Sequence, residues 1–391
     1  MIQAAKSLGV ESVVLDVTED APGRALADHF YCVAGNDYET TREVALRHQV
    51  KGLVTSQMEK PMRLMARLAA ELGLRYHTPE VTAYSLDKWL MKAAFRKGNV
   101  PCARGVLIEP GAELPEAQIA EMGFPVILKP KDATSSQGVF RVESLSQAQR
   151  LLETTRSYSK SQEVIVEEFL DGPEFSVEAI TYEGQTTIVQ ITEKFLRPFP
   201  CPVEIGHLQP APVSPEQHEA ISQATVAAIN AIGIDNSASH AEVKLTRDGA
   251  KLVEIGARLG GDFISSYLTV ASCGIDMDRA AIQAALGQSP ELKPTEQQYA
   301  YIKYIELPVG SLITAVHDYE DVLSAPEVVF AHLGMAPGTV VPEITESKKR
   351  PGFVIVKGET RAQVLELAQK YEQQLLAKFV LEQEALTGSE R

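Results

Sequence analysis

Two glutamates, Glu242 and Glu254, lie on either side of an Asp-Gly turn signal at 248–249, and Arg258 follows them along the chain. The segment from 240 to 255 alternates polar and apolar residues, which is typical of a β-hairpin. Carboxylates that meet on one face of such a hairpin can hold a divalent cation. Mg²⁺ is usually held by one or two carboxylates, with phosphate oxygens completing its shell. The pattern therefore points to chemistry on a phosphate with a bound metal ion.

The register of this hairpin decides whether the two carboxylates meet. With a three-residue loop over 247–249, Glu242 lies opposite Glu254, whereas with a two-residue loop the two side chains fall on opposite faces. We favour the three-residue loop because it alone places the apolar residues of the segment on a single face. Those residues are Ala241, Val243, Val253 and Ile255. Like charges opposite each other destabilise a sheet, so the pair suggests a bound cation. The alternative is a solvated polar face whose repulsion salt screens.

Two further segments could bind a nucleotide. Lys129 ends a predicted strand over 124–130, and no bulky apolar side chain follows before Val139. Small residues let backbone N–H groups approach phosphates. Within 164–170, the acidic pair at 167–168 interrupts an apolar strand that could offer backbone groups to an adenine edge. Taken singly, the first segment is more often a flexible turn and the second is usually a solvated strand end.

Helical and extended patterns alternate in the N-terminal part of the chain. Short apolar runs at 13–17 and 52–55 predict strands, and periodic spacing at 40–49 and 60–72 predicts helices. Together they predict βαβ units with a parallel sheet. The chain begins inside a predicted helix at 1–8, so we expect the usual first strand of such a domain to be missing.

The remaining signals predict a longer series of strands and helices. One helix is expected from Leu86 to Lys97 with Ser85 as its N-cap. A proline-rich connection at 198–215 precedes a predicted helix at 216–232. Further strands are expected at 139–142, 164–170, 174–180, 302–306 and 353–357, and further helices at 145–156 and from Arg361 to Lys378, capped by Thr360.

The bulk properties exclude several classes of protein. With 391 residues the chain exceeds what one core usually organises, so we expect two to four compact units. The net charge of −15 argues against nucleic acid as the main partner, because a phosphate backbone needs a basic surface. The chain shows no membrane-length apolar run, no secretory signal and no CxxC spacing of its cysteines. We therefore expect a soluble, cytoplasmic protein that binds no membrane.

In their order along the chain, the lysines, the small-residue loop, the acidic strand and the glutamate pair resemble the ATP-grasp superfamily over roughly residues 10–290. The run VEIGARLGGD is most similar to its carboxylate–amine ligases, which include the L-amino-acid (dipeptide) ligases. This resemblance implies an α/β and α+β multidomain fold. We expect a Rossmann-like domain at 1–88, an ATP-grasp domain at 89–290 with lobes at about 89–170 and 171–290, and a smaller α+β domain at 291–391.

The resemblance also implies a nucleotide site. The residues that would contact or cover the ATP phosphates are Lys92, Lys129, Ser135, Ser136 and Gly138. The residues that would receive adenine and ribose are Glu167, Glu168, Leu170 and Glu174, of which the last would bind the ribose.

The metal and acceptor sites follow from the same resemblance. Glu242 and Glu254 would hold Mg²⁺, with Mn²⁺ as the alternative metal, and Arg258 would stabilise the transferring phosphoryl group or the acyl phosphate. Lys194 and His207 would line the acceptor side. Many members of the superfamily have an asparagine two residues after the second metal glutamate, where this chain has glycine. We therefore expect one metal contact to be missing or replaced by water.

The resemblance implies an ADP-forming carbon–nitrogen ligase. A substrate carboxylate would attack the γ-phosphate of ATP to give an acyl phosphate, and an amine would then displace the phosphate. The partners would be small-molecule carboxylate and amine substrates, and a homodimer is the default expectation for the oligomeric state. Two alternatives stay open: an ATP-grasp carboxylase or formyl-transferring enzyme of nucleotide-precursor metabolism, and a catalytically silent nucleotide-binding module.

Overall fold

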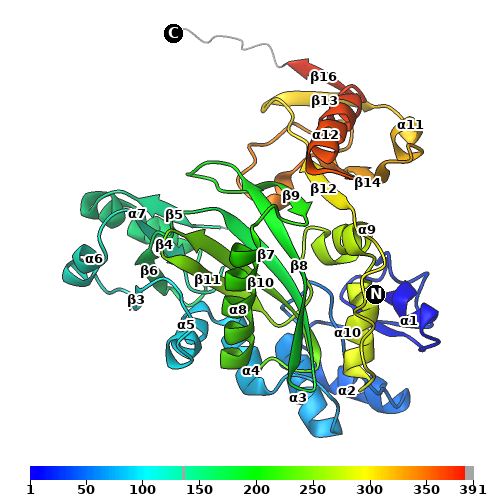
Figure 1. The fold of residues 1–391 in the computed structure, drawn as a ribbon, viewed down its shortest axis with the longest axis horizontal. Helices are drawn as coiled ribbons and strands as arrows, with labels where there is room; N and C mark the ends of the chain where they lie inside the picture. Colours follow the sequence, from blue (N-terminus) through cyan, green and yellow to red (C-terminus); the bar gives the residue numbers. More distant parts are fainter. Residues whose placement is uncertain (134–136, 384–391) are drawn as a thin grey trace. The chain divides into compact units, whose positions relative to one another are not determined.

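The computed structural model describes residues 1–133 and 137–383, and the chain divides into two compact units whose elements are labelled in Figure 1. The first unit consists of Met1–Ala103, Leu170–Ile191 and Pro212–Thr295. The second consists of Arg104–Phe169, Thr192–Ala211 and the chain from Glu296 onward. Each unit therefore joins segments that are far apart in the sequence. Ser135 and Ser136 of the predicted phosphate loop lie outside the described residues.

The N-terminal part of the first unit contains two parallel strands, β1 (Val13–Asp16) and β2 (His29–Cys32). The helices of this region are α1 (Ile2–Ser7), α2 (Tyr38–Arg47), α3 (Met62–Leu72), α4 (Pro79–Leu86) and α5 (Lys88–Lys97). The predicted strand at 13–17 and the helices predicted at 1–8, 40–49 and 60–72 are confirmed. A parallel pair is present, but β1 pairs with β2 and not with the predicted strand at 52–55, and the described residues between β1 and β2 form no helix.

The strand predicted at 52–55 is wrong, since these residues adopt no strand geometry. Their apolar character has another cause. Gly52 packs so closely on the end of a later helix that a Cβ there would lie 3.2 Å from the carbonyl oxygen of Ala285. Leu53 packs on the core cluster of Tyr38, Ala45 and Leu68, whereas Val54 is exposed. The strand beside β1 is β2.

The helix predicted from Leu86 to Lys97 is correct in its C-terminal part but wrong at its start. Ser85 lies inside α4, where its hydroxyl donates to the carbonyl of Val81. Asp87 adopts an extended conformation and its carboxylate accepts from the backbone N–H groups of Trp89 and Leu90 at 2.9 and 3.0 Å. Asp87 is therefore the N-cap of α5, and two short helices meet where one was expected.

The central strands of the first unit are antiparallel. β10 (Ser237–Thr246) pairs with β7 (Glu174–Tyr182) on one side and with β11 (Gly249–Gly256) on the other. Helix α8 (Pro215–Ile232) packs on β10 and β11, and its start is fixed by a capping box between Ser214 and Gln217. A π-helix (Ile264–Leu268), α9 (Thr269–Cys273) and α10 (Met277–Ala285) follow. Among the described helices, none is long and apolar enough to cross a membrane.

The second unit contains one antiparallel sheet in the order β3-β6-β4-β5, with α6 and α7 packed against it. The elements are β3 (Gly105–Ile108), α6 (Glu116–Met122), β4 (Val126–Pro130), β5 (Phe140–Val142), α7 (Leu145–Ser157) and β6 (Val164–Glu168). Its core contains Ile119, Leu128, Val142 and Val166, all fully buried. The predicted strand, loop and strand around Lys129 are thereby confirmed outside the three residues that are not described.

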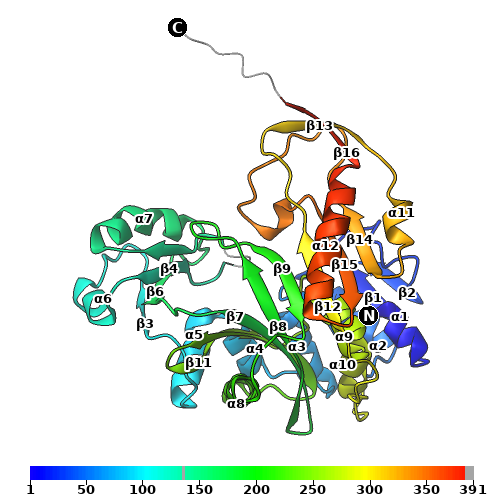
Figure 2. The same cartoon turned by 45° about the horizontal axis from the view of Figure 1, so that its top comes forward.

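The same unit holds a second group of strands. β12 (Tyr299–Tyr304) pairs with β9 (Glu204–Gln209) and β15 (Gly352–Gly358), and β15 pairs with β14 (Val328–Leu333). Helix α12 (Arg361–Leu376), begun by its Thr360 cap as predicted, lies along β15 (Figure 2). The remaining elements are β13 (Ser311–Val316), α11 (Glu320–Leu323), a 3₁₀ turn (Ser347–Lys349) and β16 (Phe379–Gln383).

The predicted proline-rich connection at 198–215 contains an ordered strand, β9, and follows another that the sequence pattern did not indicate, β8 (Gln185–Leu196). Pro202 and Pro210 stand just outside the ends of β9, where no ladder N–H group is needed. The prolines therefore bound the strand and do not prevent it.

Replacing Gly172 with alanine is expected to lower the free energy of unfolding by more than about 2 kcal/mol. This glycine has φ +145°, and a Cβ would lie 2.1 Å from the carbonyl oxygen of Leu245 in β10. The measurement is the midpoint of urea unfolding. Gly184→Ala is the matched control, because Gly184 has φ +74° but no atom within 4 Å of the added Cβ. Equal losses in the two variants would contradict the steric explanation.

Candidate active site

The β10–β11 hairpin brings the two predicted metal glutamates together. Glu242 pairs directly with Glu254, and Ala241 pairs with Ile255. The prediction that the carboxylates face each other is therefore confirmed. The predicted three-residue loop is wrong, because Thr246 pairs with Gly249 and leaves a two-residue loop.

A β-bulge reconciles the short loop with the facing carboxylates. Val243 pairs with Leu252 and not with Val253, so the register shifts by one residue between the loop and the glutamates. One extra residue in a strand returns the following side chains to the other face. Leu252 is fully buried where Val253 was expected to be, and Val253 is only partly buried. The bulge therefore places Glu242 opposite Glu254, which the three-residue loop was expected to do.

A lysine that the sequence pattern did not indicate sits on this pair. Lys88, the first residue of α5, donates from Nζ to Glu254 Oε2 at 2.6 Å. Burial alone would lower the pKa of the Lys88 ammonium, but the carboxylates of Glu254, Glu59 and Glu242 raise it above its ordinary value. Lys88 can reach Glu254 because α5 begins directly after its N-cap, Asp87. Lys88 was not predicted because this helix was expected to start at Leu86.

The residues present fit a divalent cation. Two carboxylates meet on one face, and a positive charge, the Lys88 ammonium, already lies against them. Among the described residues, no third carboxylate, imidazole or thiol joins Glu242 and Glu254 in a metal-type cluster. A cation bound there would therefore complete its shell with oxygens from a nucleotide or water, which is the usual arrangement for Mg²⁺.

Arg258 lies just beyond β11 and is held by the protein. Its Nη2 donates to Glu59 Oε1 at 2.6 Å, and its Nη1 donates to the carbonyl of Leu259 at 3.0 Å. The guanidinium lies over Gly256, where a Cβ would be 3.2 Å from Arg258 Cζ. A larger residue at 256 would press on the arginine. This close approach is a physical reason for the glycine at the position where an asparagine was expected.

The glutamate pair belongs to a wider polar face on three strands. Along β7, Glu174, Ser176 and Glu178 pair in turn with Lys244, Glu242 and His240 of β10. Lys244 Nζ lies 3.5 Å from Glu174 Oε2. Side chains that pair across strands share a face, and so do residues two apart on one strand. The predicted ribose ligand Glu174 and the predicted metal glutamates therefore share one surface.

The second unit holds several of the predicted nucleotide residues. Lys129 Nζ donates to Glu167 Oε1 at 2.5 Å, and both side chains are almost fully buried. Glu168 instead binds Arg104, accepting from its backbone N–H at 2.8 Å and its Nε at 2.6 Å. Lys129, the predicted phosphate ligand, thus contacts Glu167, a predicted adenine ligand. The carboxylate of Glu168 is instead bound to Arg104.

Three more predicted nucleotide residues are described by the structure. Gly138, in the second unit, has φ +69°, and a Cβ there would be 2.7 Å from the Tyr158 ring, so both conformation and space require glycine. Leu170 and Lys92 belong to the first unit. Lys92 lies on α5 one turn after Lys88 and is 1 % exposed.

The two residues predicted to line the acceptor side are neighbours. Lys194 of β8 pairs directly with His207 of β9. Both side chains are buried, and Lys194 Nζ lies 3.7 Å from Glu204 Oε1. The ring of His207 meets the ring of Tyr304 edge to face at 6.2 Å. The structure therefore makes neighbours of the two residues that the resemblance assigned to the acceptor side.

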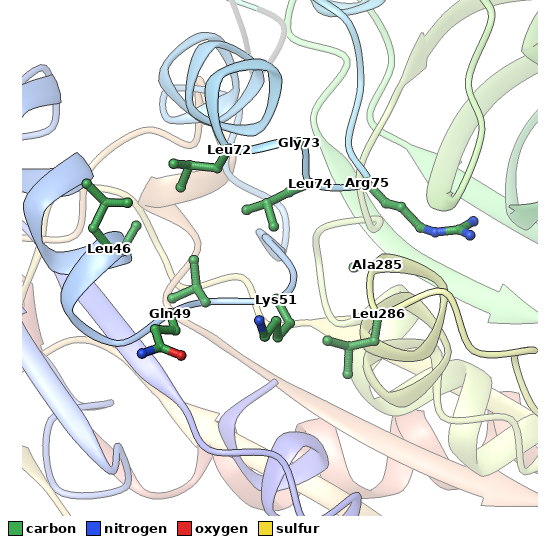
Figure 3. A pocket seen from close by; sticks show the side chains of 11 residues that line it. Leu46, Gln49, Lys51, Leu72, Gly73, Leu74, Arg75, Ala285 and Leu286 are labelled. Atoms are coloured by element: carbon green, nitrogen blue, oxygen red, sulfur yellow. The ribbon is translucent and has the colours of Figure 1, made fainter.

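A hollow of about 480 Å³ in the first unit is a separate feature (Figure 3). It lies where α2, α3 and α10 end, and its lining includes Leu46, Gln49, Lys51, Leu74 and Arg75. None of the predicted site residues lines it. We assign it no part in the chemistry.

His77 anchors the backbone just before Arg258. It is 4 % exposed, and its Nε2 lies 3.0 Å from the carbonyl oxygen of Ala257. Burial lowers the pKa of His77 to about 4 from an ordinary 6.5, and the contacts with Ala257 and Asp235 only partly oppose this. The folded chain therefore holds this imidazole neutral at a pH where the unfolded chain protonates it.

The stability of the first unit should consequently fall as the pH is lowered through the window from 6.5 to 4. Between pH 7 and pH 5 the buried imidazole should account for a loss of about 2 kcal/mol. Thermal unfolding at the two pH values checks this, and His77→Gln should flatten the dependence. His218→Gln, at an exposed position on α8, is the control. An unchanged pH dependence in His77→Gln would refute the assignment.

Lys88→Gln should lower the melting temperature in the presence of a chelator by about 2–4 °C, equivalent to about 1 kcal/mol. The reason is that the facing carboxylates lose their neutralising ammonium. Adding Mg²⁺ should then raise the melting temperature more in this variant than in the original chain. Lys251→Gln, on the same hairpin, is the control and should show neither effect. Identical responses to Mg²⁺ in the two variants would argue against a cation site.

Comparison with known proteins identifies two domains and several relatives. Residues 122–266 match the ATP-grasp domain, and residues 304–379 match the L-amino acid ligase C-terminal domain 2. Dapdiamide A synthase of Enterobacter agglomerans is 27% identical over 293 residues, covering 71% of this chain and 68% of its own length. Alanine–anticapsin ligase of Bacillus amyloliquefaciens is 27% identical over 331 residues, covering 78% and 66%. The chain thus spans about two thirds of the length of these relatives.

Solved structures show the same fold. The L-amino acid ligase from Bacillus licheniformis superposes with a TM-score of 0.80 at 21% identity, covering 98% of this chain and 95% of the other. Phosphoribosylglycinamide synthetase from Anaerococcus prevotii gives 0.75 at 21% identity, covering 98% and 96%. The predicted resemblance is confirmed at the level of domains: the chain contains an ATP-grasp domain and, after it, an L-amino acid ligase C-terminal domain 2.

Proposed function

We propose that the chain is an ATP-dependent carboxylate–amine ligase that forms an amide or peptide bond and releases ADP and phosphate. The observation that carries this proposal is the opposed pair Glu242 and Glu254, with a lysine ammonium on it and Arg258 directly beyond. Carboxylates arranged to share a cation, with an arginine at hand, are what phosphoryl transfer requires.

The names of the relatives support an amino acid as one substrate. Alanine–anticapsin ligase is named for joining alanine to anticapsin, and other relatives are named D-alanine–D-alanine ligase and carnosine synthase. We therefore propose small-molecule substrates, one offering a carboxylate and the other an amine. Because the chain spans only part of the length of several relatives, their substrates are not transferred individually.

In the proposed mechanism the substrate carboxylate attacks the γ-phosphorus of ATP, and the bond to the β-phosphate oxygen breaks. An acyl phosphate and ADP result. The amine then attacks the acyl carbon, and phosphate leaves with the electron pair of the carbon–oxygen bond. A bound Mg²⁺, or Mn²⁺, would neutralise phosphate charge during the transfer. Most of the rate enhancement would come from positioning and charge neutralisation.

We propose the following roles for residues of the first unit. Glu242 and Glu254 would hold the metal ion, and the Lys88 ammonium, which lies on Glu254, would neutralise a phosphate oxygen of the bound nucleotide. Arg258, fixed by Glu59, stabilises the transferring phosphoryl group. Glu174 binds the ribose hydroxyls.

The family resemblance also suggests roles for residues of the second unit. Lys129 and Glu167 contact the nucleotide, and Lys194 and His207 line the acceptor side. A cytoplasmic location and a homodimer remain predictions, the second of which light scattering can test.

Glu254→Gln and Arg258→Ala should each reduce acceptor-dependent ADP release at least about 100-fold, while leaving the melting temperature near that of the original chain. Release of ADP is measured with panels of amino-acid pairs, bicarbonate and formate. The matched controls are Glu219→Gln on α8 and Arg247→Ala at the tip of the hairpin, both exposed.

Near-normal turnover in both site variants would sink the proposal. Stimulation by bicarbonate or formate alone would favour a carboxylating or formyl-transferring enzyme. ATP binding without stimulation by any acceptor would favour a catalytically silent nucleotide-binding module.

A further inference from the structure

A fully buried carboxylate lies at one end of the polar face, next to the glutamate pair. Glu178 of β7 is 0 % exposed and accepts from Ser265 Oγ at 2.7 Å and from the backbone N–H of Gly260 at 3.2 Å. Its Oε1 lies 2.5 Å from Nδ1 of His240. A carboxylate is costly to bury unless its oxygens are well bonded, so this arrangement holds its three partners firmly.

The loop after Arg258 is pressed onto this carboxylate. A Cβ at Gly260 would lie 2.7 Å from both carboxylate oxygens of Glu178 and from Nδ1 of His240. Asp262 and Phe263, which follow, both have positive φ, at 52° and 63°. Consecutive strained residues of this kind cluster at functional sites. The loop after Arg258 is therefore packed tightly on β7 at Glu178, so neither segment can shift easily.

The hydrogen bond to Glu178 fixes the state of the imidazole. A carboxylate accepts, so Nδ1 of His240 carries the hydrogen and a neutral ring has its lone pair on Nε2. Within the part of the chain that the structure describes, no protein group bonds to Nε2. The side chain remains 12% exposed. The free nitrogen is therefore open to a ligand.

The position of His240 along the face indicates which ligand. Pairs succeed one another along β7 and β10 about every 7 Å, from Glu174 and Lys244 to Ser176 and Glu242, and then to Glu178 and His240. If Glu174 binds the ribose and Glu242 the metal ion, as proposed above, the nucleotide runs along this face toward His240. His240 then lies past the γ-phosphate, where the acyl group and the amine must meet.

We propose that His240 is a further catalytic residue, whose Nε2 accepts a hydrogen bond from the attacking amine and takes its proton as the amide forms. This inference rests on the proposed ligase function. The amine nitrogen bonds to the acyl carbon, phosphate leaves with the electron pair of the carbon–oxygen bond, and the proton lost by nitrogen passes to Nε2. Glu178 is the positioning residue that holds the ring by Nδ1, in the manner of a carboxylate behind a catalytic imidazole.

The test separates the two half-reactions. Hydroxylamine is unprotonated at neutral pH and traps an acyl phosphate as a hydroxamate without help from a base. His240→Gln should keep carboxylate-dependent hydroxamate formation within about threefold of the original chain, but should lower amide formation with an amino-acid amine at least about 100-fold. Glu178→Gln should show the same split to a smaller degree. His218→Gln, the exposed histidine variant, should change neither.

Two independent readouts guard against misfolding. Mg-ATP binding and the melting temperature should be preserved in His240→Gln, and His240→Asn serves if that variant does not fold. In a chain labelled with ¹⁵N-histidine, the His240 signal should report hydrogen on Nδ1 and should shift in Glu178→Gln.

Each outcome bears on a different claim. Equal loss of hydroxamate and amide, or loss of neither, would overturn the role of His240, as would an Nδ1 without hydrogen. An original chain that forms neither product with any substrate pair would defeat the proposed ligase function itself, and this inference with it.

Discussion

Two carboxylates held opposite each other on neighbouring strands repel, and the polar face of the first unit is organised around this constraint. The bulge in β11 places the pair, and the start of α5 delivers an ammonium to it. Arg258 is kept beside the pair by Glu59 and by the absence of a side chain at Gly256. These features come from four separated parts of the sequence. All of them either create the excess of negative charge at Glu242 and Glu254 or place a positive charge near it.

Burial of charge distinguishes the two ends of this face. Glu174 and Lys244 form a partly exposed pair at 3.5 Å, which solvent weakens. Glu178 is fully buried and bonded to three groups. Burial would raise the pKa of the Glu178 carboxyl, but His240, Ser265 and Gly260 together bring it below its ordinary value. The Glu174–Lys244 pair can therefore exchange its partners for a ligand, whereas Glu178 is expected to keep its partners.

The alternation of polar and apolar residues over 240–255 was sufficient to predict that Glu242 and Glu254 face each other, because side chains two apart in a strand share a face. The same alternation could not distinguish a three-residue loop from a two-residue loop followed by a bulge, since both give this opposition. Lys88 was missed because α4 and α5 are both helical and no glycine or proline separates them; only the cap geometry of Asp87 reveals the break. Strand β9 was missed because the prolines on both sides of it are typical of an irregular connection. Nor does residue order show that Glu178 and Gly260 touch, because packing between distant segments leaves no local signal.

The contact between Lys88 and Glu254 also bears on the order in which ligands arrive. A divalent ion that comes alone must displace an ammonium from its best anionic partner, which weakens the binding of the free ion. An ion that comes together with phosphates offers the ammonium a new partner at the moment it loses the old one. By linkage, each of the two ligands then strengthens the binding of the other. The site is thereby biased toward the metal–nucleotide complex as a single ligand.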